Sequence, residues 1–353
     1  MESLVGHAMK ILVAGNMGYV GPVVVAHLRR RFPRATLIGF DTGFFAHCLS
    51  VPDRVPETVL TYQAFGDIRE FPTDLLEGVD AVVNLAAISN DPMGARFEAV
   101  TEEINYRASV NLARLARDAG VRTFVFASSC SVYGAADGVP QKETALLNPL
   151  TAYARSKIAT EEALRAADLG EMQIVSLRFA TACGMSPRLR LDLVLNDFVA
   201  CAVSAREISV LSDGSPWRPL IDVEDMARAV EWAIAGAGEM PSRFFAVNVG
   251  SEGWNYRVKE LADAVARLVP GTVVSINSAA AADRRSYRVD FSLFKSLASE
   301  HQPQVTLERS IEGLRDGLAA VGFCDRNFRD SQFIRLKVLE RHLQARRLSE
   351  SLR

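Results

Sequence analysis

Histidine is scarce in this chain of 353 residues, which contains only five. No two of them stand at a metal-ligand spacing such as His-x-x-x-His, and none lies near an obvious nucleophile. This scarcity disfavours histidine-rich metal sites and Ser-His-Asp hydrolysis, so we expect no metal. An enzyme with this sequence would use another acid/base, and tyrosine is available.

Paired cysteines and long apolar runs are also missing. The five cysteines are scattered without a Cys-x-x-Cys pair, which indicates reduced thiols rather than disulfides or a zinc site. No apolar run reaches the ~20 residues of a membrane helix, and residues 1–10 lack the apolar core of a signal peptide. The net charge is only -2. We therefore expect a cytoplasmic protein that binds neither membranes nor nucleic acid.

A glycine-rich turn follows the first apolar run, residues 10–14, which we interpret as a buried parallel strand. Glycines at 15, 18 and 21 permit a tight turn and a close approach of the backbone to a ligand. Pro22 then starts a helix whose free N–H groups can bind a pyrophosphate. The residues that we expect to contact a dinucleotide here are Gly15, Met17, Gly18, Tyr19, Val20 and Gly21.

An acidic residue ends the second predicted strand, residues 36–40. Asp41 stands twenty positions beyond Gly21. A carboxylate there accepts hydrogen bonds from both ribose hydroxyls and repels a 2′-phosphate. The pattern predicts NAD rather than NADP.

Two later strand ends extend the predicted cofactor site. Asp67 and Ile68 follow a strand-like stretch, where Asp67 either lies near the adenine or caps a helix. Residues 81–87 form another apolar strand with small residues at its end, which leave room for a ligand. We add to the cofactor site Asp67, Ile68, Leu85, Ala86, Ala87, and Asn105 of the helical segment 100–119. The polar loop 88–94 follows the strand, and its Ser89 and Asn90 are expected sugar contacts.

Tyr153 and Lys157 stand four positions apart, which places them on one face of a helix. An ammonium beside a phenol favours the phenolate and is expected to lower the pKa of Tyr153. The fifth strand, residues 123–127, delivers the serines of segment 128–131 at its carboxyl end. A hydroxyl there can share a proton with the group on which the tyrosine acts.

These pieces together resemble the extended short-chain dehydrogenase/reductase family, specifically its NAD-dependent nucleotide-sugar epimerases and dehydratases. The resemblance rests on the glycine turn 15–21, Asp41, the strand end 84–87, Ser128-Ser129, Val132-Tyr133-Gly134 and Tyr153-x-x-Ser156-Lys157.

The resemblance implies an α/β fold, a Rossmann-type doubly wound parallel sheet with a smaller C-terminal α/β substrate-binding domain. We expect residues 1–178 to form the NAD-binding domain, with residues 222–250 returning to it. Residues 179–221 and 251–353 would form the substrate-binding domain and a C-terminal helical extension. The family also implies a homodimer.

The family mechanism assigns roles to the serine, tyrosine and lysine. Tyr153 removes a proton from a sugar hydroxyl while NAD+ takes the hydride from the same carbon. Lys157 bonds the nicotinamide ribose, and Ser129 bonds the reacting oxygen. We place Ser128 in the cofactor site, and prefer Ser129 over Ser128 and Ser131 as the catalytic hydroxyl by its spacing from Val132-Tyr133-Gly134.

Further segments resemble those with which the family binds a nucleotide-diphosphate sugar substrate. Segment 217–225 resembles a family segment whose arginine, here Arg218, grips the diphosphate. The cluster 284–288 offers a second arginine; we choose Arg285, and leave Arg284 and Arg288 open. Asn196 is either a diphosphate contact or a surface amide. The expected substrate contacts are Ser89, Asn90, Ser129, Cys130, Ser131, Thr181, Asn196, Arg218 and Arg285.

The residues after Ser129 narrow the expected reaction. Family 4,6-dehydratases place an Asp-Glu pair directly after the catalytic hydroxyl, whereas this chain has Cys130 and Ser131. The expected reaction is therefore epimerisation at C4 through a 4-keto intermediate. A nucleotide-sugar ketoreductase or oxidase, and an atypical dehydratase, remain alternatives. An amphipathic helix near 333–343 is expected to pack on its own domain or on a second subunit.

Overall fold

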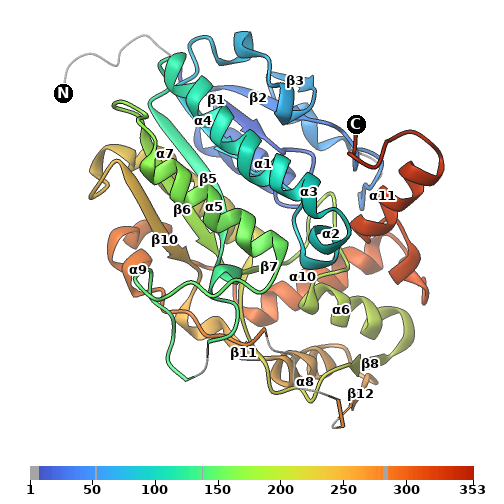
Figure 1. Ribbon diagram of the computed structural model, residues 1–353. Helices are drawn as coiled ribbons and strands as arrows, with labels where there is room; N and C mark the ends of the chain where they lie inside the picture. The colour runs from blue at the N-terminus through green and yellow to red at the C-terminus, as the bar shows by residue number, and fades with distance from the viewer. Residues whose placement is uncertain (1–7, 52–53, 137, 278, 281–284) are drawn as a thin grey trace.

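A seven-stranded parallel sheet forms the centre of the computed structural model, which describes residues 8–51, 54–136, 138–277, 279–280 and 285–353 (Figure 1). The strand order is β10-β6-β5-β4-β1-β2-β3. The strands are β1 (Lys10–Ala14), β2 (Thr36–Asp41), β3 (Tyr62–Phe65), β4 (Ala81–Asn84), β5 (Thr123–Ser129), β6 (Gln173–Phe179) and β10 (Phe244–Val249). The order reverses between β1 and β4, and ligands of doubly wound sheets bind at such a point. The predicted Rossmann-type sheet is confirmed.

Alternate side chains of the sheet enter two hydrophobic cores. In β1, Ile11 and Val13 belong to one core, whereas Leu12 and Ala14 belong to the other. This burial on both faces explains why the strands are continuous apolar runs. The first core includes helices α1 (Gly21–Arg31) and α7 (Val223–Ala235), and the second includes α4 (Ser109–Asp118) and α5 (Ala152–Ala166).

Two short sheets and three helices form a second part of the molecule, called the substrate side because the sequence predicts that it binds the substrate. One sheet contains β7 (Thr181–Cys183), β9 (Trp217–Asp222) and β11 (Asn255–Arg257), and the other β8 (Glu207–Val210) and β12 (Val273–Ile276). Helices α6 (Val194–Ala205), α8 (Val258–Leu268) and α10 (Leu307–Ala320) pack together there, and α9 (Ser292–Leu297) contacts β10. The domain boundaries drawn from the sequence stay a prediction.

The remaining helices lie near the sheet's second core. They are α2 (Asp91–Arg96), α3 (Glu98–Thr101), a π-helix (Glu102–Ala108) that continues into α4, and α11 (Arg335–Gln344). Helix α11 packs against α2, on the side of the large sheet where β2 and β3 lie (Figure 1). The amphipathic helix expected in the extension is thus present and packs on its own chain. Its Leu339 enters the second core of the large sheet, and its Arg335 donates to the Arg188 carbonyl on the substrate side. In the described ranges, no helix has the length and apolarity needed to cross a membrane.

Candidate active site

A cavity of about 880 Å³ opens along the carboxyl ends of the central strands and continues between the large sheet and the substrate side. Its lining comes from the turn after β1 and the ends of β2, β4, β5 and β6. Helix α5, strands β7 and β9, and the C-terminal extension complete it. Its size falls in the range of small-molecule sites.

The glycine turn has the shape that a pyrophosphate requires. Gly15 has a φ of +83°, and a Cβ there would stand 2.5 Å from the backbone N of Ala86. A Cβ on Gly21 would stand 2.3 Å from the carbonyl oxygen of Asn16. Gly18, by contrast, has only the Gly15 oxygen within 4 Å of its Cβ position and lines the cavity. The turn therefore packs tightly where it meets the sheet and stays open where a ligand would lie.

Asp41 lies at the end of β2 with its carboxylate held by two backbone donors. It accepts hydrogen bonds from the N–H of Met17 at 3.0 Å and of Gly43 at 2.8 Å. Burial raises its pKa even though both donors oppose the shift. The carboxylate lines the cavity and has capacity left for ribose hydroxyls, so the site fits NAD. Met17 is 4% exposed and does not line the cavity, and its N–H donates to Asp41, so the structure does not bring its side chain to the predicted cofactor site.

The other predicted cofactor residues, apart from Asn105, border the same cavity. The Tyr19 hydroxyl donates to the Gly184 carbonyl at 2.6 Å. Asp67 caps a short turn by accepting from the Arg69 N–H at 2.9 Å, and it also lines the cavity. Its two alternative roles are thus compatible. Val20, Ile68, Leu85, Ala86 and Ala87 also line the cavity.

Tyr153 and Lys157 lie one turn apart on α5, as the spacing predicts. The helix starts at Thr151, whose hydroxyl accepts from the Ala154 N–H at 3.1 Å. Burial raises the pKa of Tyr153 to about 12, and the neighbouring Ser129 opposes this shift. Burial lowers the pKa of Lys157 to about 7.

The charges that act on the pKa of Tyr153 in this structure are those of Asp91, which raises it, and Arg190, which lowers it, so the expected effect of Lys157 stays a prediction. The Lys157 ammonium donates to the carbonyl oxygen of Ala127 at 2.6 Å and lies 5.5 Å from the centre of the Tyr153 ring. Desolvation of the charged form is the largest cause at both groups. The charge of Glu161 opposes the shift of the Lys157 pKa, and Ser129 and Arg190 oppose that of the Tyr153 pKa.

Ser129 and Ser131 line the cavity, whereas Cys130 between them does not. The Ser129 hydroxyl accepts from the Ser131 N–H at 3.1 Å. Ser131 lines the cavity, and its hydroxyl oxygen is buried without a hydrogen-bond partner. Cys130 is fully buried and its thiol donates to the Arg178 carbonyl at 3.0 Å. Burial raises the pKa of this thiol, so the predicted substrate contact of Cys130 is not supported.

Ser128 borders the cavity with its hydroxyl turned into the protein. It donates to the Glu161 carboxylate at 2.5 Å, and that carboxylate forms a buried ion pair with Arg178 at 2.6 Å. Its hydroxyl is therefore committed to holding β5, α5 and β6 together.

Two predicted contacts, Asn105 and Asn196, are fully buried and do not line the cavity. Asn105 accepts from the Ile88 N–H at 2.8 Å and donates to the Ile88 carbonyl at 3.0 Å and to the Ser156 hydroxyl at 3.1 Å. Asn196 accepts from the Gly184 N–H at 3.1 Å and donates to the Arg190 carbonyl at 2.8 Å. Both amides fix loops that border the cavity, so neither predicted ligand contact is supported.

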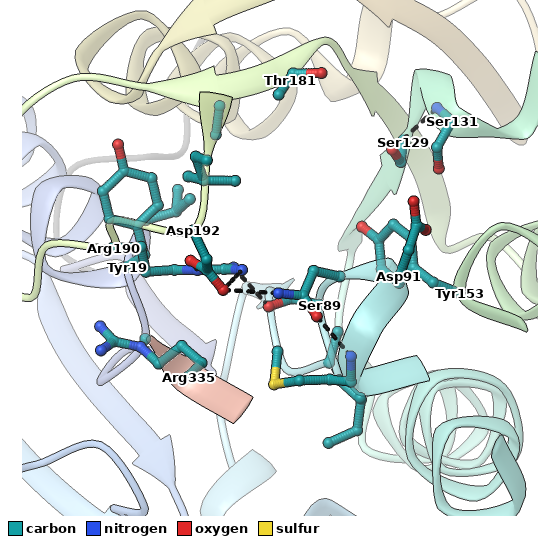
Figure 2. A pocket seen from close by; sticks show the side chains of 18 of the residues that line it. Tyr19, Ser89, Asp91, Ser129, Ser131, Tyr153, Thr181, Arg190, Asp192 and Arg335 are labelled. Carbon is teal, nitrogen blue, oxygen red and sulfur yellow. Dashed lines mark hydrogen bonds and ion pairs between the residues drawn. The ribbon is translucent and has the colours of Figure 1, made fainter. Parts of the chain in front are cut away.

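The sequence did not single out the charged groups that surround Tyr153. Figure 2 shows the Asp91 carboxylate beside Tyr153, below Ser129 and Ser131. Its charge raises the pKa of Tyr153, although less than burial does. Asp91 also accepts a hydrogen bond from the Arg285 guanidinium at 2.9 Å, 194 positions away. The sequence offered one sign of Asp91, which is the carboxylate in the polar loop 88–94. Its pairing with Arg285 could not be predicted, because it depends on the fold.

A second pair, Arg190 and Asp192, crosses the cavity opposite Asp91 (Figure 2). The two residues pair at 2.9 Å, and Arg190 also donates to the Ser89 hydroxyl at 2.9 Å. Asn90 donates to Asp192 at 2.7 Å. The predicted sugar contacts Ser89 and Asn90 are thus in place at the cavity wall.

The remaining predicted substrate residues, Thr181, Arg218 and Arg285, line the cavity. Arg288 lies over the Trp217 ring at 5.2 Å and is not part of the lining, which favours Arg285 between these two. Arg284 lies outside the described residues.

The model of the NAD-dependent epimerase/dehydratase family matches residues 11–250. The chain belongs to this family. The predicted family and the predicted use of NAD are confirmed, and the chain is an enzyme of this type.

Several relatives of the chain are named as epimerases. An uncharacterized UDP-glucose epimerase of Bacillus subtilis, YtcB, is 29% identical over 230 residues, which are 63% of this chain and 71% of that protein. The UDP-glucose 4-epimerase of Streptomyces lividans is 29% identical over 278 residues, 73% of this chain and 80% of the relative. Among solved structures, the UDP-glucose-4-epimerase of Stenotrophomonas maltophila with bound NAD and formylated UDP-arabinopyranose has a TM-score of 0.76. It is 23% identical, with 89% of this chain and 99% of that chain covered. This last likeness shows the shared fold.

Proposed function

We propose that the enzyme epimerises a nucleoside-diphosphate sugar at C4 through a 4-keto intermediate. One observation supports this most: Tyr153, Ser129 and Ser131 meet at the cavity wall, while the position of the first carboxylate of a dehydratase holds the buried Cys130. The segment after the catalytic hydroxyl therefore contains no acid/base for removing water. The names of the relatives support a UDP-sugar as the substrate.

Tyr153 carries out both proton transfers in this proposal. In the oxidation step its phenolate takes the proton of the C4 hydroxyl, and in the return step it gives a proton back to the C4 oxygen. Ser129 donates a hydrogen bond to that oxygen, and Ser131 lies in the same wall. Bound NAD+ supplies the hydride acceptor and a positive ring that favours the phenolate.

The remaining side chains orient the substrate. Arg218 lines the cavity from β9 and carries the bidentate fork suited to a diphosphate. Arg285 is held by Asp91 near Tyr153, so we place it toward the sugar end rather than at the base. Lys157 holds the nicotinamide ribose from the floor of the site.

A second candidate is an atypical dehydratase, because Asp91 supplies a carboxylate beside Tyr153 from a different segment of the chain. A carboxylate there could remove a proton next to the keto carbon. The two reactions differ in solvent exchange: C4 epimerisation leaves every carbon-bound hydrogen in place, whereas elimination exchanges one with water.

The experiment is a panel of UDP-, GDP-, dTDP- and CDP-sugars incubated with the enzyme and followed by NMR. A C4 epimer of one of them supports the proposal. The enzyme would also be denatured and its released nucleotide identified. Tightly held NAD supports the epimerase, while an empty site together with net oxidation or reduction supports the ketoreductase or oxidase.

We further propose a homodimer located in the cytoplasm. The five cysteines are unpaired and four of them are buried, which suits a reducing compartment. The family resemblance supports the dimer. Light scattering of the purified enzyme measures its mass, and a monomer would contradict this proposal.

A further inference from the structure

The family match ends at residue 250, yet the C-terminal segment, Asn327–Arg353, reaches back to the NAD-binding part of the chain. There it lies beside two loops. One is 42–48, which follows Asp41, and the other is 67–70, which starts at Asp67. Both loops start at cavity residues that the dinucleotide pattern places around the adenosine half of the cofactor.

The first loop is held by side chains of α11. His342 lies 3.1 Å from the carbonyl oxygen of Phe44, and its ring lies 5.6 Å from that of His47 in an edge contact. Arg335 places its guanidinium 4.9 Å from the centre of the Phe45 ring. Phe44, Phe45 and Arg335 all line the cavity.

The second loop is held by the last residues of the segment. Arg69 donates to the carbonyl oxygens of Ser351 at 2.8 Å and Leu352 at 3.0 Å. The same guanidinium pairs with Asp67 at 2.6 Å. Arg353 adds an ion pair with Glu70.

Buried anchors fix the segment on this side of the molecule. Leu339 and Leu352 are fully buried, and both belong to the core that contains β1 residues Leu12 and Ala14. Arg335 is 1% exposed and donates at 2.7 Å to the carbonyl of Arg188, so the segment also contacts the substrate side of the molecule. A surface tail without a local role would not bury an arginine and two leucines against these loops.

We propose that the segment Asn327–Arg353 helps to form the cofactor site. It fixes loops 42–48 and 67–70 beside the adenosine half of the bound cofactor. The cofactor is therefore released only when the segment detaches. Arg335 and Arg69 act as positioning residues, Arg335 through loop 42–48 and Arg69 through Asp67. The proposal rests on the assignment of the cofactor and not on C4 epimerisation.

The test measures the release of NADH from the loaded enzyme by stopped-flow fluorescence, with excess NAD+ to prevent rebinding. Deletion of residues 349–353 removes the contacts to Arg69 and Glu70, and Leu352→Ser weakens the same anchor in the complete chain. Both variants should release NADH at least tenfold faster than the parent. Hydrogen exchange should also rise in loops 42–48 and 67–70.

The matched control is Glu350→Gln. It removes the exposed ion pair of Glu350 with Arg96 of α2, at 3.0 Å, which belongs to the same tail but touches neither loop. Its release rate should stay that of the parent. The experiment needs no turnover of a sugar. It therefore tests the role of the segment even if the proposed C4 epimerisation is disproved.

An unchanged release rate in both variants, with exchange showing that the tail has detached, would overturn the proposal. Equal loss of NADH and of nucleotide-sugar binding would also overturn it, since that result describes general loosening. If the deletion does not fold, Leu352→Ser alone decides between these outcomes.

Discussion

The hydroxyl of Tyr153 and the ammonium of Lys157 stand one helical turn apart, yet each responds mainly to its own burial. A pKa of about 12 keeps the Tyr153 phenol neutral near pH 7, whereas a pKa of about 7 leaves Lys157 divided between its charged and neutral forms. At the residue scale, activation of the tyrosine therefore depends on additional positive charge, which bound NAD+ provides.

Replacing Tyr153 with phenylalanine removes the acid/base while keeping the ring that fills the site. Turnover should fall by about 100- to 10,000-fold, the range of general acid–base catalysis. Retention of NAD after gel filtration should be unchanged. Tyr62→Phe, at an exposed position on β3, is the control. Near-normal activity of Tyr153→Phe would overturn the assignment.

Asp91→Asn tests the electrostatic link between the loop after β4 and the tyrosine. The Asp91 charge raises the pKa of Tyr153, because a phenolate beside a carboxylate is unfavourable. Its removal should therefore lower that pKa and move the acidic limb of the kcat/KM profile to lower pH. Asp118→Asn, an exposed change on α4, should leave the profile in place. A limb that stays fixed or moves to higher pH contradicts this link.

At the scale of elements, the parts of the site are joined by buried amides and ion pairs. Asn105 lies in the π-helix before α4 and connects the loop after β4 to Ser156 of the catalytic helix. A π-helix within a longer helix is frequent at functional sites. Its role here is to bring the two elements that flank the substrate into one rigid unit.

Asn105→Ala should destabilise the protein by about 2–4 kcal/mol, since it leaves the buried N–H and carbonyl of Ile88 without partners. Urea denaturation measures the free energy of unfolding. The exposed Asn111→Ala on α4 should change it by no more than about 0.5 kcal/mol. Equal effects of the two changes would show that Asn105 does not join the elements.

Glu161→Gln tests the buried ion pair with Arg178, which joins α5 to β6 and also receives the Ser128 hydroxyl. Removing one partner of a buried pair leaves an uncompensated charge and costs about 3–5 kcal/mol. Glu162→Gln, at the exposed neighbouring position, is the control. Chemical denaturation gives both values, and a loss below about 1 kcal/mol for Glu161→Gln would contradict this account.

Features that depend on a few neighbouring residues could be predicted from the sequence. The glycine turn, Asp41 at a strand end and the Tyr153/Lys157 spacing each depend on a few neighbouring residues, and the structure places them in one cavity. The sequence misjudged residues whose partners are distant. Asn196 was assigned to the ligand or the surface, although its apolar neighbours in α6 already indicated a buried amide. The Asp91–Arg285 pair spans 194 positions and depends on the whole fold.

At the scale of the whole molecule, one chain forms a seven-stranded sheet with a core on each face, a substrate side and a C-terminal segment that returns to the sheet. The packing of this segment was left open by its sequence, because an amphipathic helix fits a neighbouring subunit as well as its own chain. Its buried leucines and its bonds to Arg69 show that it packs on its own chain.

Catalysis in deuterium oxide tests the central claim of C4 epimerisation most directly. A nucleotide sugar that the enzyme accepts would be converted in this solvent and its product examined by NMR. The account predicts the C4 epimer, with its full complement of carbon-bound hydrogen and no solvent deuterium. Deuterium next to the former keto carbon, or a product that has lost water, would contradict it and favour the dehydratase.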